Sequence, residues 1–389
     1  MVEIAAALVR AGGRALVLAE TGRLAERLAA SGGELMPFAA ASKNPLRILA
    51  NAHAMRGLVA RYGVDLLHAR SRAPAWSGLI AARLARVPFV TTYHGAYGER
   101  NALKRAYNSV MARGDVVIAN SRFTAELIRH RYGVAPERIE SIERGVDVCA
   151  FDPDRVARER VEALRASWGV DARTRIILQA ARLTSWKGQS VLIDAACRLK
   201  AAGRLAHSAV VLAGDAQGRD GYVRTLQSQI EASGLSPQIR LVGHIEDMAA
   251  AYLAAHVSVV ASTKPEAFGR TAIEAAAMGC PVVATDLGAP RETILAAPAV
   301  AQEATTGWLV RAGDAEALAH SLAEALSLAE EARAAMGVRA RQHVLAHYTV
   351  DAMQRRTLAV YDRLLGTVLE RRFSALVHAG APTALSRQS

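Results

Sequence analysis

The stretch EAFGRTAIEAAAMGCPVVATDLGAPRE carries the side chains with the clearest potential for chemistry. Glu266, its first residue, follows an apolar segment typical of a buried strand, and Gly269 would let a ligand approach the backbone closely. A helix is expected to start near Arg270, and the free N–H groups at a helix start bind anions such as a diphosphate. Glu274 lies about one turn inside that helix, where its carboxylate can accept hydrogen bonds from the two hydroxyls of a ribose.

Two cations stand in a similar position earlier in the chain. Arg182 follows the apolar segment Ile176–Ala180, and Lys187-Gly188 comes just before a helical pattern. Across a strand-to-helix turn, an arginine and a lysine at this spacing can converge on one pair of phosphates. The alternative is an ordinary solvated loop with two cations.

His94 is a further candidate, at the end of the apolar segment Phe89–Tyr93 and followed by a glycine. A histidine there can pack inside a loop or act on a ligand, and the local sequence leaves both open. Gly214 and His244 follow apolar segments of the second half, so we expect them to line a nucleotide site. His244 or the adjacent Ile245 would meet the base through backbone atoms.

Short apolar segments alternate with helical patterns along nearly the whole chain, which predicts parallel sheets covered by helices on both faces. In such sheets ligands bind where the carboxyl ends of the strands meet the loops. The predicted strands are Ala15–Ala19, Val64–His68, Phe89–Tyr93, Val116–Ala119, Ile139–Ile142, Ile176–Ala180, Ala209–Ala213, Ile239–Val242, Val257–Val260, Val282–Ala284 and Trp308–Val310.

A chain of 389 residues suits two such α/β domains. We place the first domain at residues 1–150 and the second at 151–348, because GVD and FDP interrupt the pattern between residues 145 and 153. A last helix, Asp351–Leu369, belongs to a segment, 349–373, expected to pack back towards the first domain. Residues 374–389 are expected to form a weakly structured tail.

The combination of these patterns resembles the retaining glycosyltransferase family 4. Glu266 and Glu274, with Phe268-Gly269 between them, match its E-x7-E motif. The downstream segment PVVATDLGAPRE also resembles the sequence of that family. Arg182 to Gly188 resembles R-L-x3-K-G, and His94-Gly95 resembles the family's H-G element. The resemblance spans roughly residues 2–370, and it implies a GT-B fold, in which two Rossmann-like doubly wound domains face each other across a cleft.

The resemblance also implies an activity and a site. The enzyme would move a sugar from a nucleotide-diphosphate-sugar, with either UDP or GDP as the carrier, by a displacement on one face of the sugar. No cofactor is implied, and no metal, because no Asp-x-Asp stands in the right context. The residues implied in catalysis are His94, Glu266, Arg182 and Lys187. Those implied in donor binding are Arg182, Lys187, Glu266, Phe268, Gly269, Arg270, Thr271, Glu274, Gly214, His244 and Ile245.

The charge of the chain points to an anionic partner. The net charge is +12, and residues 1–150 carry 21 Lys and Arg against 12 Asp and Glu. This asymmetry favours an anionic glycan or lipid-linked acceptor, as in lipopolysaccharide or other cell-surface polysaccharide synthesis, although a merely soluble basic surface is the alternative. No nucleic-acid motif is present. Without a signal peptide or membrane span in the sequence, we expect a cytoplasmic protein, with peripheral contact to the inner membrane surface.

The front of the sequence departs from the family pattern. Val2–Val9 reads as a helix, whereas a doubly wound domain normally begins with a strand and a glycine-rich turn. We therefore expect the natural protein to carry about 15–25 further residues at this end. Two other functions stay open at this point: a nucleotide-sugar-binding GT-B protein without turnover, regulatory or truncated, and a GT-B-fold epimerase. An oxidoreductase is excluded, because no G-x-G-x-x-G follows a strand.

Overall fold

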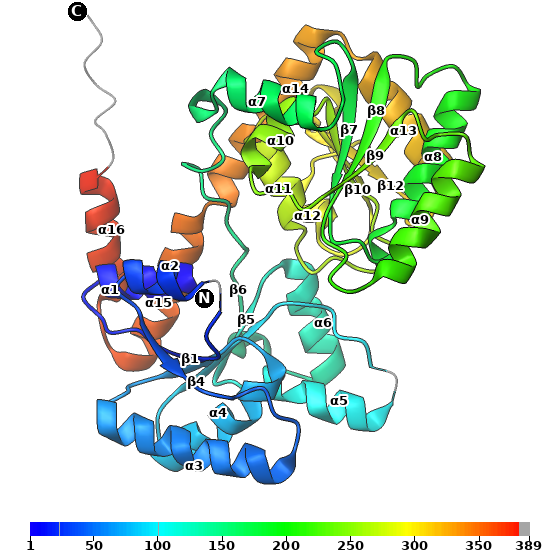
Figure 1. Cartoon of the computed structure of the whole chain (residues 1–389). Helices are drawn as coiled ribbons and strands as arrows, with labels where there is room; N and C mark the ends of the chain where they lie inside the picture. Colours follow the sequence, from blue (N-terminus) through cyan, green and yellow to red (C-terminus); the bar gives the residue numbers. More distant parts are fainter. Residues whose placement is uncertain (23, 100, 381–389) are drawn as a thin grey trace, which may run out of the picture. The chain divides into compact units, whose positions relative to one another are not determined.

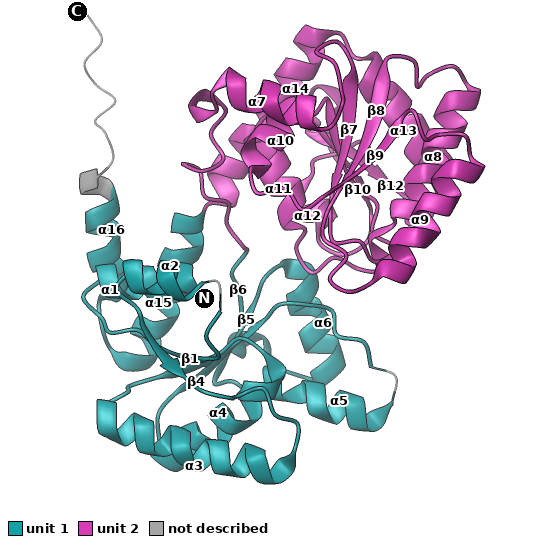
Figure 2. Ribbon diagram, viewed as in Figure 1, with its two compact units in different colours: residues 1–143, 350–389 teal, residues 144–349 magenta. Residues whose placement is uncertain are grey.

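The computed structural model describes residues 1–22, 24–99 and 101–380. The chain forms two compact units (Figure 2). Unit 1 consists of residues 1–143 together with the chain from residue 350 onward, and unit 2 consists of residues 144–349. The boundary between the units thus lies slightly before the predicted one, and the segment that begins at residue 350 belongs to the first unit. Among the described residues, no helix is both long and apolar enough to cross a bilayer.

Unit 2 is built on a six-stranded parallel sheet (Figure 1). Its first strand, β7, lies in the middle of the sheet beside β10. From there β8 and β9 extend the sheet in one direction, and β11 and β12 extend it in the other, so the order is β9-β8-β7-β10-β11-β12. The strands are β7 Arg175–Ala180, β8 Ser208–Ala213, β9 Ile239–Gly243, β10 Val257–Val260, β11 Val282–Thr285 and β12 Gly307–Val310.

Helices cover both faces of this sheet, because its inner strands are apolar on both sides. Ile177 of β7 packs with α8, α9 and α13, whereas its neighbours Ile176 and Leu178 pack with α10 and α11 on the other face. The helices of unit 2 are α7 Arg158–Ser167, α8 Gln189–Ala201, α9 Asp220–Ala232, α10 Met248–Ala254, α11 Arg270–Ala277, α12 Pro290–Thr293, α13 Ala315–Ser327 and α14 Glu330–His347.

Unit 1 contains a parallel four-stranded sheet, β3-β4-β5-β6, and a separate parallel pair, β1-β2. Helices α15 and α16 pack with α1 on Val90 and Ile118, on one face of the larger sheet, and α4 and α6 cover Phe89 and Val117 on the other. The strands are β1 Leu16–Ala19, β2 Glu34–Pro37, β3 Leu67–Ala69, β4 Phe89–Tyr93, β5 Val116–Ala119 and β6 Ile139–Ser141. The helices are α1 Val2–Arg10, α2 Ala25–Ala30, α3 Pro45–Tyr62, α4 Arg72–Ala85, α5 Ala102–Asn108, α6 Arg122–Tyr132, α15 Val350–Leu365 and α16 Leu369–Gly380.

The two sheets of unit 1 share packing but no strand pairing. Leu18 of β1 and Leu67 of β3 contribute to one apolar cluster with Met55 of α3. Within the described part of the chain, however, β1 pairs only with β2, and β3 pairs only with β4. The additional strand expected from the sequence stays a prediction.

Three details differ from the sequence-based expectations. The helix expected over Asp351–Leu369 is two helices, because Gly366 interrupts it with a positive φ of 68°. The second of these, α16, extends to residue 380, so the expected loss of structure after residue 374 is wrong for residues 374–380, and residues 381–389 lie outside the described residues. Strand β2 was not predicted, since only its central residues are partly buried.

Candidate functional site

The sheet of unit 2 places two loops side by side. Strands β7 and β10 are neighbours, but the chain leaves β7 towards one edge of the sheet and β10 towards the other. The loops after their carboxyl ends, 181–188 and 261–269, therefore border the point where a doubly wound sheet leaves a crevice for ligands. These loops touch directly, since a Cβ atom on Gly188 would lie only 1.9 Å from the carbonyl oxygen of Ala261.

Lys187 and Glu266 form an ion pair across these two loops. The Nζ atom of Lys187 lies 2.5 Å from Oε1 of Glu266, and the hydroxyl of Ser262 donates a hydrogen bond to the same oxygen at 2.5 Å. The side chains of the pair are only 16% and 10% exposed. Lys187 and Glu266 each stand out in the sequence, but neither their pairing nor the contribution of Ser262 could be inferred from it.

The backbone around the pair is held by further hydrogen bonds. The side-chain amide of Gln179, on β7, donates to the carbonyl of Lys187 at 2.7 Å, and the N–H of Thr263 donates to the carbonyl of Trp186 at 2.8 Å. On the other side, Glu266 exchanges backbone hydrogen bonds with the segment 287–289 that follows β11. Three strands of the sheet thus fix the position of one lysine and one glutamate.

Two helices begin at this edge without a side-chain cap. Gly188 precedes α8 and Gly269 precedes α11, both in the left-handed conformation, with φ of 72° and 84°. No side-chain hydrogen bond caps either helix in the described structure. The first N–H groups of an uncapped helix and the positive end of its dipole favour an anion. With Lys187 between them, the two helix starts form a site suited to a diphosphate.

Glu274 lies on the buried side of α11, 9% exposed. Arg270, one turn earlier, pairs with it at 3.0 Å between Nη2 and Oε1. Burial and the nearby Glu274 carboxylate raise the pKa of Tyr252, on α10, well above its ordinary value. The Tyr252 hydroxyl therefore stays neutral beside this carboxylate. Nothing in the local sequence pointed to Tyr252, because α10 meets α11 only through the fold.

The other residues that were predicted to bind the donor from the loops after β7 and β10 lie in different surroundings. Arg182 is exposed, and its backbone carbonyl accepts a hydrogen bond from Gln189 at 3.0 Å. Thr271 is half-buried at the start of α11. Phe268 differs from its expected role, because its ring is 4% exposed and packs edge-on against Tyr348 with the centroids 5.8 Å apart. The Phe268 side chain is thus a core residue, and only its backbone can face a ligand.

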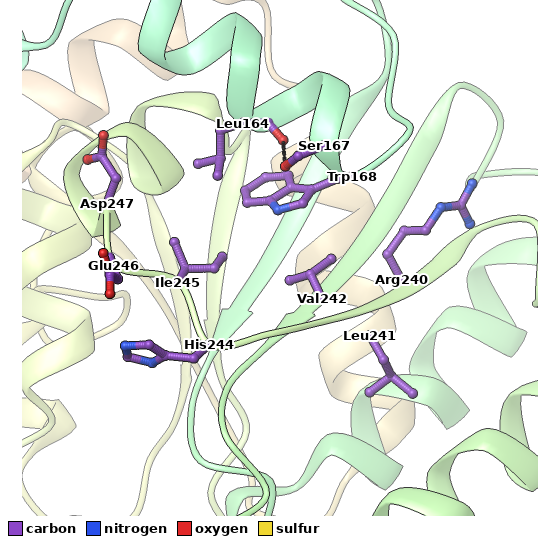
Figure 3. Close-up of a pocket in the computed structure, with 10 residues that line it drawn as sticks. All are labelled: Leu164, Ser167, Trp168, Arg240, Leu241, Val242, His244, Ile245, Glu246 and Asp247. Atoms are coloured by element: carbon purple, nitrogen blue, oxygen red, sulfur yellow. Dashed lines mark hydrogen bonds between the residues drawn. The ribbon is translucent and has the colours of Figure 1, made fainter.

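Gly214 follows β8 and packs closely on the loop after β7, since its Cβ would lie 1.9 Å from the carbonyl oxygen of Ala181. His244 and Ile245 follow β9. They border a cavity of about 450 Å³ between that strand and the end of α7. Lys187, Glu266 and Glu274 are not among the residues that line this cavity. Figure 3 shows the ring of His244 pointing away from Trp168. The cavity's lining residues are Leu164, Ser167, Trp168, Arg240, Leu241, Val242, His244, Ile245, Glu246 and Asp247.

His94 belongs to unit 1, where it is half-buried directly after β4. The neighbouring Thr92 hydroxyl lies 2.6 Å from Nε2 of His68, and the other ring nitrogen of His68 lies 2.6 Å from the hydroxyl of Tyr361. Burial, with Arg70 nearby, lowers the pKa of His68 well below its ordinary value. His68 is therefore a neutral, structural histidine that ties α15 to the sheet.

Comparison with known proteins agrees with this architecture. The model of the family described as "Glycosyl transferases group 1" matches residues 160–343, and that of "Glycosyltransferase Family 4" matches residues 1–149. A glycosyltransferase from Rickettsia africae ESF-5, solved as a crystal structure, is 32% identical, covers 94% of each chain and superposes with a TM-score of 0.84.

Two further similarities are more distant. A D-inositol 3-phosphate glycosyltransferase of Corynebacterium glutamicum (strain R) is 27% identical over 82% of this chain and 78% of that protein. The structure of Alr3699/HepE from Anabaena in complex with UDP and glucose is 24% identical, with a TM-score of 0.79, over 93% of this chain and 95% of that one. The similarity to the Anabaena structure, at 24% identity, supports the fold alone.

The two sheets, the site between β7 and β10 and these similarities define a GT-B glycosyltransferase. More narrowly, the chain belongs to the group 1 glycosyltransferases of family 4.

The buried ion pair should stabilise unit 2 in a way that exposed pairs do not. We expect Lys187→Met and Glu266→Gln each to lower the free energy of unfolding by about 1–3 kcal/mol, because each leaves a desolvated partner. The double variant should lose less than the sum, with a coupling of roughly 1 kcal/mol or more, measured by chemical denaturation. The matched control is Arg158–Glu162, 87% and 57% exposed, for which coupling should stay below about 0.5 kcal/mol. Equal couplings for the two pairs would contradict this account.

Proposed function

We propose that this glycosyltransferase takes a sugar from a nucleotide-diphosphate-sugar and passes it, with retained anomeric configuration, to an anionic glycan or lipid-linked acceptor. The observation that carries the proposal is the Lys187–Glu266 pair between two uncapped helix starts at the switch point of the unit 2 sheet. This arrangement combines a cation and two positive helix ends, as a diphosphate requires, with carboxylates suited to hydroxyl groups.

In this proposal the donor lies along the carboxyl edge of the sheet. Lys187 and Arg182 bind the diphosphate with the N–H groups at the start of α11, and Glu274 accepts hydrogen bonds from the ribose hydroxyls. Backbone atoms of His244 or Ile245 meet the base. The Anabaena protein, whose structure contains UDP, offers a precedent for a nucleotide on this fold, and the base of the donor here is either uridine or guanosine.

The proposed reaction breaks the bond between the anomeric carbon and the diphosphate oxygen, and forms a bond from that carbon to the acceptor oxygen on the same face. The acceptor proton goes to the departing phosphate oxygen. Lys187, Arg182 and the α11 start balance the charge that develops on the diphosphate, so no metal ion is assigned a step. Glu266 is already held by Lys187 and Ser262, which favours a role in binding the sugar over nucleophilic attack. His94 is assigned a contact to the transferred sugar.

The proposed acceptor is anionic because the basic residues of the chain concentrate in its first part. The Corynebacterium relative is named for a phosphorylated acceptor, D-inositol 3-phosphate, which is consistent with an anionic acceptor class. We place the reaction at the cytoplasmic face of the membrane, in the synthesis of a cell-surface polysaccharide or lipopolysaccharide.

The stereochemistry of the reaction tests the proposal directly. Incubation with UDP- and GDP-sugars and phosphorylated or lipid-linked acceptors should release the nucleoside diphosphate, and proton NMR of the product should show the donor's anomeric configuration. A chelator such as EDTA should leave the rate unchanged, since no step uses a metal. Inversion at the anomeric carbon would remove the mechanism. Donor binding without transfer or hydrolysis would instead indicate a binding protein, and isomerisation of the donor sugar an epimerase.

Arg182 offers a clean test of the diphosphate contact, because its side chain is exposed. Arg182→Ala should leave the melting temperature unchanged and weaken nucleoside diphosphate binding by about 10–150-fold, the range for one charge-assisted hydrogen-bonded group, as measured by calorimetry. The control Arg173→Ala removes an exposed arginine that precedes β7, at the opposite end of the sheet. Undiminished affinity in Arg182→Ala, or an equal loss in the control, would remove the assignment.

The role of Glu274 is tested by the ribose itself. Glu274→Gln keeps the side chain's size but loses charge-assisted hydrogen bonds worth roughly 1.5–3 kcal/mol. We expect a greater loss of affinity for the ribonucleotide than for its 2′-deoxy analogue, in parallel calorimetric titrations. Equal losses for both nucleotides would show that Glu274 does not contact the 2′-hydroxyl.

A further inference from the structure

The positive charge of the chain is concentrated in one stretch of unit 1. Residues 35–114 contain 12 Lys and Arg and only two acidic residues, Asp65 and Glu99, a net of +10 within a chain of +12. This stretch includes helices α3, α4 and α5, whose places in unit 1 can be followed in Figure 1. The rest of the chain carries a net charge of only +2, so most of the excess positive charge lies in this stretch.

Helix α3 also carries large apolar residues on the side that faces solvent. Its inner side is buried through Ala52, Met55 and Val59. On the opposite side Leu46 is 76% and Leu49 is 56% exposed. Further exposed residues on this side are Ala50, His53, Ala54, Gly57 and Ala60, and the exposed cations Arg47, Arg56 and Arg61 lie beside them. A water-facing helix side normally carries polar residues, and α3 contains no acidic residue.

Helix α5 repeats this combination of leucine and cations. Leu103 is 82% exposed, and Lys104 and Arg105 beside it are exposed as well. The first turn of α5 is exposed to solvent. The helix is held through its second half, where Asn108 is buried and the guanidinium of Arg105 donates a hydrogen bond to the carbonyl of Arg131.

The two helices flank the same part of α4. The hydroxyl of Ser77 donates a hydrogen bond to the carbonyl of Ile48, in α3, and the indole N–H of Trp76 donates to the carbonyl of Tyr107, in α5, both at 3.1 Å. Successive residues of a helix point about 100° apart, so α3 and α5 lie on adjoining sides of α4. The exposed leucines and cations of both helices therefore belong to one region of unit 1.

We infer that this region, which we call the basic leucine surface (Lys43, Leu46, Arg47, Leu49, Arg56, Arg61, Leu103 and Lys104), docks on an anionic lipid bilayer. Cations beside a membrane are attracted by acidic headgroups, and exposed leucines gain by entering the boundary between headgroups and acyl chains. A nucleic acid would satisfy the cations but offers no apolar layer to cover the leucines. The inference specifies the membrane contact of the proposed function, but charge and leucine exposure alone carry it.

The test compares binding to two kinds of vesicle by cosedimentation. The full chain should bind mixed phosphatidylcholine–phosphatidylglycerol vesicles at least about tenfold more strongly than pure phosphatidylcholine vesicles, and high salt should reduce the difference. The charge variant Lys43→Gln/Arg47→Gln/Arg56→Gln/Lys104→Gln should lose at least about tenfold in binding to the mixed vesicles, since each cation contributes roughly fivefold. The apolar variant Leu46→Gln/Leu49→Gln/Leu103→Gln should bind the mixed vesicles less strongly than the unaltered protein. Lowering the salt concentration should not restore this binding.

Matched controls come from exposed residues of unit 2. The charge control is Arg158→Gln/Arg173→Gln/Arg224→Gln/Arg311→Gln, and the apolar control is Val338→Gln/Leu345→Gln. Both controls should bind vesicles like the unaltered protein, and circular dichroism should show that every variant is folded. All variants should still bind nucleoside diphosphate, so a protein that binds vesicles but transfers no sugar would overturn the proposed function and not this inference.

Two outcomes would overturn the inference. One is equal binding to both kinds of vesicle, or equal losses in the basic leucine variants and their unit 2 controls. The other is tight binding of a duplex oligonucleotide that is lost in the charge variant and kept in the apolar variant, without any preference for anionic vesicles, which would assign the surface to nucleic acid.

Discussion

The ion pair between Lys187 and Glu266 joins residues that are 79 positions apart in the chain. It forms because β7 and β10 are adjacent in the sheet although β8 and β9 intervene in sequence. The close approach of Gly188 to Ala261 leaves no room for a side chain between the two loops, and Gln179, Thr263 and the segment after β11 fix their backbones. Removing two charges from water is costly unless each finds a partner, so the loops must keep this arrangement. The two helix starts that border the pair are positioned by the same constraint.

Much of this architecture could be predicted from the sequence, for a physical reason. Strands such as Phe89–Tyr93 and Val116–Ala119 are buried on both faces, so they appear as unbroken apolar segments, and the structure confirms their bounds. Glycines and cations after such strands mark the carboxyl ends of a parallel sheet. Strand β2 left no such signal, because its ends are exposed and only its middle is partly buried.

The site could be predicted in part. The charged residues of the site can be recognised in the sequence, because a charged side chain next to a buried apolar strand is expected to be paired or to bind a ligand. Ser262 and Tyr252 could not be found, since their importance arises from contacts between elements that only the folded chain brings together. Phe268 is the opposite case. It lies inside the sequence motif, but its packing against Tyr348 shows that its ring points into the core. The donor-binding roles themselves stay predictions.

The return of the chain to unit 1 has a consequence for how the protein is made. Val90, Val116 and Ile118 of the unit 1 sheet are covered by Leu358 and Phe373, which come from α15 and α16. The ribosome synthesises these helices only after the whole of residues 144–349. Unit 2, which is continuous in sequence, can therefore fold while synthesis continues. In the unit 1 sheet, by contrast, α1 is available early, but the part of this apolar face that α15 and α16 cover stays exposed until those helices are made. During that interval the uncovered part of this face is an apolar surface open to aggregation or to a chaperone.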